Sequence, residues 1–140
     1  MINPNKTDLW IENISQEDII KGRHYLDPQK TALIQIVDIN SVFPEPKYKK
    51  DFKYIFKFSF NDTESEADNK TITEENAKLI AQKLQECYSQ GLNIVVHCYV
   101  GVYRSGAVVQ AGLLLGYKEA RDFRIPNTLV LAKITKYLIR

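Results

Sequence analysis

The residues best suited to chemistry lie in one short segment, His-Cys-Tyr-Val-Gly-Val-Tyr-Arg-Ser-Gly at positions 97–106. Cys98 is followed, after five residues, by Arg104 and a serine. Gly101 in the middle permits backbone conformations that a side chain would block. Backbone N–H groups in such a turn can converge on an anion, and a planar guanidinium can bind two oxygens of a phosphate. The segment therefore predicts a phosphate-binding loop.

The flanking segments place this loop between a strand and a helix. Residues 93–97 are a compact apolar run typical of a buried strand, and residues 104–116 are typical of a buried helix. A helix N-terminus offers unpaired N–H groups and the positive end of its dipole to an anion. The same field and the nearby guanidinium favour the thiolate form of Cys98.

A thiolate beneath a bound phosphoryl group is a nucleophile directed at phosphorus. Ser105 is placed to donate a hydrogen bond to the sulfur of Cys98 and to ease its later departure. The residues thus predict hydrolysis of phosphate monoesters through a cysteinyl-phosphate intermediate. This chemistry needs no metal and no other cofactor.

The loop resembles the signature of the cysteine-based protein tyrosine phosphatases: His-Cys, five residues, Arg, then Ser or Thr. The central glycine and the Ser-Gly-Ala after the arginine look most like the small dual-specificity branch, above all its bacterial and phage-type members. The resemblance covers roughly residues 32–140. It implies that the substrate phosphate is bound by the loop residues Tyr99, Val100, Gly101, Val102, Tyr103 and Arg104.

The resemblance also suggests two supporting residues. His97 would order the loop through hydrogen bonds and tune the thiolate, which differs little from the role of an ordinary buried histidine. Asn127 is similar to an asparagine that braces the phosphate loop from the last helix in some relatives, but it could equally be a polar residue that starts a helix.

The leaving group needs a proton, and the later attack by water needs a base; one carboxyl group can serve both steps. Asp62 directly follows a predicted strand, and Phe58-Ser59-Phe60-Asn61-Asp62 is similar to the segment that supplies the general acid in the family. Asp68 lies in the acidic loop that follows. Spacing to Cys98 does not decide between the two. We favour Asp62, because a strand end gives a movable loop a fixed origin.

For several other residues the sequence allows both a functional and a purely structural role. Tyr103 departs from the small residue usual in the family, and both it and Tyr99 could form the rim of the site or pack elsewhere. Cys87 is favoured as a core residue over a redox partner of Cys98. A basic stretch is favoured as a solvated surface over a site for an acidic partner; it comprises Lys47, Lys49, Lys50, Lys53 and Lys57.

Alternating apolar runs and amphipathic segments predict a single α/β domain over residues 1–140. Its central sheet would be mostly parallel, with about four or five strands, and helices would flank it. We expect strands at 9–11, 32–39, 52–60 and 93–97. Helices are expected after Ser15, after Thr73, at 104–116, and at 127–138 with Pro126 at the first position of the last helix.

Composition excludes several classes of function. The 140 residues carry 19 basic and 17 acidic side chains, so the net charge of +2 is too small to predict nucleic-acid binding. The longest apolar run is shorter than the about 20 residues that cross a bilayer. Two cysteines and no visible secretory signal predict a cytoplasmic protein, with nothing that points to an obligate oligomer.

The expected substrate is therefore a phosphorylated protein, carrying phosphotyrosine and also phosphoserine or phosphothreonine if the site is shallow. A phosphoinositide or RNA 5′-phosphatase remains an alternative, although the loop has no extra lysine or arginine inside it. A non-catalytic phosphate-binding module and a redox enzyme such as an arsenate reductase are two further alternatives.

Overall fold

The computed structural model describes residues 8–121 and 123–138. In this part of the chain, five strands form one parallel sheet in the order β3-β2-β4-β1-β5. The strands are β1 (Trp10–Ser15), β2 (Thr31–Val37), β3 (Tyr54–Ser59), β4 (Asn93–Cys98) and β5 (Lys118–Glu119). The predicted α/β class and parallel sheet are confirmed, and β4 lies at the centre.

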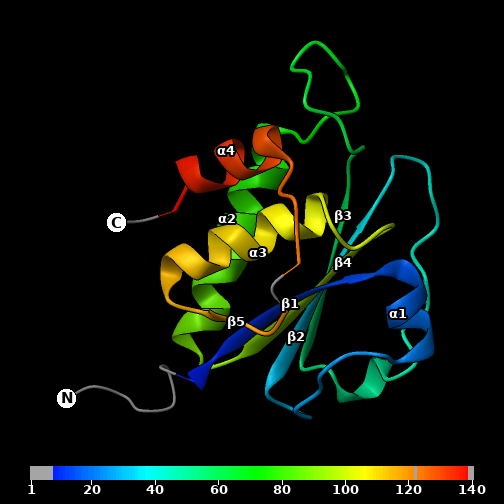
Figure 1. Ribbon diagram of the computed structural model, residues 1–140, viewed down its shortest axis with the longest axis vertical. Coiled ribbons are helices and arrows are strands. Elements are labelled where there is room, and N and C mark those ends of the chain that lie inside the picture. The colour runs from blue at the N-terminus through cyan, green and yellow to red at the C-terminus, as the bar shows by residue number, and fades with distance from the viewer. Residues whose placement is uncertain (1–7, 122, 139–140) are drawn as a thin grey trace.

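Three α-helices of this part of the chain lie between strands, α1 (Gln16–Lys21), α2 (Glu74–Ser89) and α3 (Arg104–Leu115), and α4 (Thr128–Lys136) follows β5. Figure 1 shows α2, α3 and α4 on one face of the sheet and α1 on the other. A 3₁₀ turn at Lys49–Asp51 precedes β3.

The capping chemistry of the sequence explains most helix boundaries. The side chains of Ser15, Thr73 and Asn127 accept backbone N–H groups at the starts of α1, α2 and α4. The prediction that Pro126 is the first residue of the last helix is wrong, because Asn127 is the cap and Pro126 precedes it.

Strand predictions missed two features. The first strand was expected at 9–11, but β1 runs to Ser15, because the polar residues Glu12 and Asn13 are buried rather than ending the strand. The short strand β5 was not predicted, since its two residues are exposed and carry no apolar pattern.

The sheet separates two apolar cores. Alternate side chains of β4, Ile94 and Val96, pack with α2, α3 and α4, whereas Val95 faces the smaller core that contains Ile19 of α1. Parallel strands buried on both faces read as continuous apolar runs, which is why 93–97 was recognisable from sequence.

Parallel pairing brings the carboxyl ends of the strands to one edge of the sheet. β1 ends at Ser15, which pairs with Cys98 at the end of β4, and Val37 at the end of β2 pairs with Ser59 at the end of β3. The loops after β2, β3 and β4 therefore leave the sheet at the same end (Figure 1). This edge is where ligands bind in open α/β sheets.

Among the residues described, no helix is both long and apolar enough to span a membrane.

Candidate active site

Cys98 is the last residue of the central strand and is nearly inaccessible to solvent. Three groups approach its sulfur: the Ser105 hydroxyl at 3.1 Å, the Gly101 N–H at 3.3 Å and the Ser105 N–H at 3.4 Å. Two of these groups are backbone donors. The sulfur therefore lies where a serine hydroxyl and two backbone N–H groups converge.

Gly101 allows the loop to turn back over the sheet. Its φ is +84°, and a Cβ at this position would overlap the backbone of Ile14 and Ser15. Any other residue would have to move either the loop or the end of β1. The glycine is thus required by both its conformation and its close approach to a neighbouring strand.

Asn13, on β1, is hydrogen-bonded to the loop that follows β4. Its side-chain amide donates to the carbonyl of Gly101 at 2.8 Å and to the carbonyl of Phe123 at 3.0 Å. In a trans peptide the N–H points opposite to the carbonyl, so the Val102 N–H, in the peptide that Asn13 holds, is turned away from β1. Asn13 therefore fixes the orientation of one peptide of the loop.

The N-terminus of α3 is the one among the four described α-helices that has no side-chain cap, and it shares with α4 the lack of an acidic first turn. Its N-cap, Tyr103, makes no side-chain capping bond, and its first turn contains no acidic residue. The N–H of Ser105, in that turn, donates to the Cys98 sulfur instead. A helix N-terminus without a side-chain cap is a suitable place for an anion.

Arg104 lies in the same first turn, and only 4% of its surface is exposed. One terminal nitrogen donates to the Asp38 carboxylate at 2.7 Å and to the Phe60 carbonyl at 2.8 Å. Its Nε is buried and has no hydrogen-bond partner among the described residues. A buried donor without a partner is costly, so Nε is suited to an oxygen of a bound phosphate.

Asp38 follows β2 and was not identified from the sequence. Its carboxylate is half exposed yet contacts the Arg104 guanidinium at 2.7 Å, slightly closer than the Phe60 carbonyl does. It neutralises a cation placed at the positive end of a helix, which would otherwise be unfavourable. It also orients the guanidinium, with Nε left for an anion.

The structure brings Asp62 to the same edge and keeps Asp68 in a separate turn. The side-chain amide of Asn127 donates to the Asp62 carboxylate at 2.8 Å. The backbone N–H of Asn127 donates to the Tyr103 carbonyl at 3.0 Å. Asp68 instead accepts the Lys70 N–H within its own loop. One asparagine thus links Asp62 to the loop that follows Cys98, whereas Asp68 bonds within its own turn.

His97 is fully buried behind the loop. Burial, assisted by the charge of Arg104, lowers the pKa of its ring to about 4, so the ring is neutral at pH 7. Neither ring nitrogen makes a hydrogen bond of good geometry within the described residues, although the Cys98 backbone partly offsets the effect of burial on the pKa. The described residues therefore do not show the well-formed loop hydrogen bonds expected of His97.

Cys87 lies at the other end of the molecule from Cys98. It is buried near the end of α2, and its carbonyl accepts the N–H of Leu92, just before β4 begins. A six-residue strand spans about 17–20 Å, far beyond the reach of a disulfide. Burial raises the pKa of the Cys87 thiol to about 12. The core interpretation of Cys87 holds, and the redox partnership is excluded by geometry.

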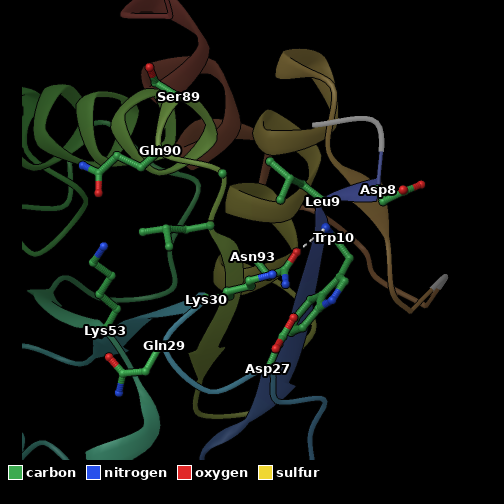
Figure 2. A pocket seen from close by; sticks show the side chains of 12 residues that line it. Asp8, Leu9, Trp10, Asp27, Gln29, Lys30, Lys53, Ser89, Gln90 and Asn93 are labelled. Atoms are coloured by element: carbon green, nitrogen blue, oxygen red, sulfur yellow. Dashed lines mark hydrogen bonds between the residues drawn. The ribbon is translucent and has the colours of Figure 1, made fainter. Parts of the chain in front are cut away.

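The basic stretch does not converge on the loop. Lys57, on the edge strand β3, lies over the ring of Phe43, and Lys49 pairs with Glu45. Lys53 lines a hollow of about 440 Å³ at the amino ends of the strands, together with Trp10 and Asn93 (Figure 2). That hollow is separated from Cys98 by the length of β4.

Comparison with known proteins supports the fold. No family model and no curated protein matches the sequence. Among solved structures, the human tyrosine phosphatase-like serine/threonine/tyrosine-interacting protein is similar, with 18% identity, a TM-score of 0.61 and coverage of 91% of this chain and 89% of that one. Tk-PTP in its active form aligns with 15% identity, a TM-score of 0.48 and coverage of 93% and 80%. The chain has the fold of tyrosine phosphatase-like proteins.

Proposed function

We propose that the protein is a phosphate monoester hydrolase that acts on phosphorylated proteins through a cysteinyl-phosphate. The observation that carries the proposal is the geometry at Cys98: two backbone N–H groups and a serine hydroxyl surround its sulfur, and the buried Nε of Arg104, at the start of the next helix, has no hydrogen-bond partner in the described part of the chain. Each of these groups suits one stage of phosphoryl transfer.

In the first step the Cys98 sulfur attacks phosphorus while the bond from phosphorus to the leaving oxygen breaks. Loop N–H groups and Arg104 stabilise the charge on the transferring group. Asp62 gives its proton to the leaving oxygen. The products of this step are the free alcohol or phenol and a phosphate covalently attached to sulfur.

In the second step water attacks the same phosphorus atom. The Asp62 carboxylate accepts a proton from that water, and the bond between sulfur and phosphorus breaks. The Ser105 hydroxyl, 3.1 Å from the sulfur, stabilises the departing thiolate. Inorganic phosphate leaves, and Cys98 and Asp62 return to their starting protonation states.

The decisive experiment measures hydrolysis of a small aryl phosphate in the presence of EDTA. We expect turnover by the wild type, a loss of more than 1,000-fold in Cys98→Ser, and a loss of about 100-fold in Asp62→Asn. Asp68→Asn is the matched control and should retain full activity. If Asp68→Asn lost activity and Asp62→Asn did not, Asp68 would be the acid.

A second candidate is a module that binds phosphorylated residues without hydrolysing them. The human structural neighbour is described as an interacting protein, which favours this alternative. Wild-type protein that binds vanadate or phosphate but never releases phosphate from aryl phosphates or phosphopeptides would establish binding and exclude the enzyme.

A further inference from the structure

Exposed apolar side chains gather beside the phosphate loop. Ile20, Val42, Tyr99 and Val100 are 46%, 87%, 69% and 54% exposed, respectively; we call these four residues the apolar rim. Scattered exposed apolar residues are ordinary, but several around one candidate site are a mark of an interaction surface.

Two shallow hollows connect the apolar rim to the site. One, of about 400 Å³, is lined by Val42, Tyr99 and Asp38. The other, of about 540 Å³, is lined by Ile20 and again by Tyr99. Asp38 contacts Arg104, and Tyr99 is the residue after Cys98, so both hollows adjoin the place where a phosphate would bind.

Charge at the apolar rim is already neutralised within the protein. Lys21 is the cation that lines the second hollow, and it pairs with Glu17 at 3.2 Å. Asp38 in the first hollow pairs with Arg104. Neither hollow offers an unpaired cation from the described residues to a second phosphate or an acidic side chain.

We propose that the apolar rim binds an uncharged apolar side chain adjacent to the phosphorylated residue of a polypeptide. This inference rests on the proposed function and narrows its substrate class. Successive Cα atoms are about 3.8 Å apart, so a side chain one or two residues from the phosphorylated one can reach Tyr99 and Val42. Burying that side chain removes apolar surface of both partners from water.

The test compares phosphotyrosine peptides that differ at one position, with Leu or Asp placed in turn at each of the two positions on either side of the phosphotyrosine. We expect wild type to favour Leu by about tenfold in kcat/KM at one or more positions. Val42→Ser and Ile20→Ser probe the two hollows. At least one of them should reduce the preference to less than threefold, while leaving hydrolysis of a free aryl phosphate unchanged.

Leu114→Ser is the matched control, because Leu114 is 65% exposed on α3 and lines neither hollow. It should keep the full preference for Leu. The inference is overturned if wild type shows no preference, or if the preference survives in both rim variants. It is also overturned if phosphoinositide vesicles are hydrolysed better than every peptide, or if the rim mediates a concentration-dependent dimer in sedimentation that Val42→Ser abolishes.

Failure of the proposed function gives a different result. If the protein hydrolyses the aryl phosphate but shows no preference among the peptides, the proposed function stands and only the inference about the apolar rim is overturned. For a protein with no turnover, binding of the same peptides to Cys98→Ser still measures the Leu preference, and equal affinity for Leu and Asp peptides would overturn the inference.

Discussion

Asn13 shows how one buried side chain can set the geometry of a binding loop. It touches no sulfur and has no nucleophilic character, yet it holds the Gly101 carbonyl and the segment at Phe123 together. Its effect on phosphate would pass through the peptide that it orients. Asn13 is thus a positioning residue in the proposed reaction.

We expect Asn13→Ala to weaken inhibition by inorganic phosphate or vanadate by about tenfold or more, because a loop N–H is no longer held toward the anion. Asn93→Ala is a matched control: Asn93 is also a buried strand asparagine, but it bonds the Trp10 N–H at the opposite edge of the sheet. Equal losses of anion affinity in the two variants would show that Asn13 acts only through general stability.

The two cysteines should differ in reactivity. Iodoacetate at pH 7 should alkylate Cys98 at least tenfold faster than Cys87, because burial raises the pKa of Cys87 to about 12 and leaves it a thiol. Mass spectrometry of the digested protein identifies the labelled residue. Phosphate should protect the labelled site, and comparable labelling of Cys87 in the folded protein would contradict the assignment of roles.

At the scale of elements, the phosphate loop depends on a contact between the turn after β4 and the end of β1. Gly101 lies against the backbone of Ile14 and Ser15, and the Gln16 N–H donates to the Tyr99 carbonyl at 3.2 Å. Neither element can shift without the other. The segment before α4 adds a second support, through the Asn127 N–H on the Tyr103 carbonyl.

Gly101→Ala should therefore lower the free energy of unfolding by about 2 kcal/mol or more and reduce hydrolysis at least 100-fold. Gly91→Ala is the control, since Gly91 also has a positive φ, of +74°, but a Cβ there would meet nothing within 4 Å. It should cost only about 1 kcal/mol of backbone strain and leave activity intact. Urea denaturation and aryl phosphate hydrolysis measure the two effects.

At the scale of the whole molecule, burial of a neutral histidine at the sheet centre makes stability depend on pH. The pKa of His97 is about 4 when folded, against an ordinary value of 6.5. Between these values the unfolded chain binds more protons than the folded one. The stabilisation is thus complete above pH 6.5 and is lost as the pH falls toward 4.

The contribution of His97 should be about 2 kcal/mol smaller at pH 5 than at pH 7. His97→Leu should flatten this part of the dependence, as measured by urea midpoints at each pH. The protein has two histidines, so His24→Gln serves as the control and should keep the wild-type slope. A slope that persists in His97→Leu would show that other groups produce it.

The loop between β4 and α3 was predictable from its own residues, because Gly101, Arg104 and the start of α3 belong to one continuous segment. Strand β4 and the helix caps at Ser15 and Thr73 were predictable for the same reason: burial pattern and capping act over a few residues. The two-residue strand β5 had no such local pattern, and its pairing with β1 depends on the assembled sheet.

The partners of the loop required tertiary structure. Asn13 meets Gly101 across 88 residues, Asp38 meets Arg104 across 66, and Asn127 meets Asp62 across 65. Nothing in the local sequence singled out Asn13 or Asp38, whereas Asp62 and Asn127 were named from the sequence but their contact was not. By itself, the sequence determined which groups are candidates for the proposed phosphoryl transfer. The parallel sheet decided which side chains hold those groups in place, because it brings the carboxyl ends of distant strands to a single edge.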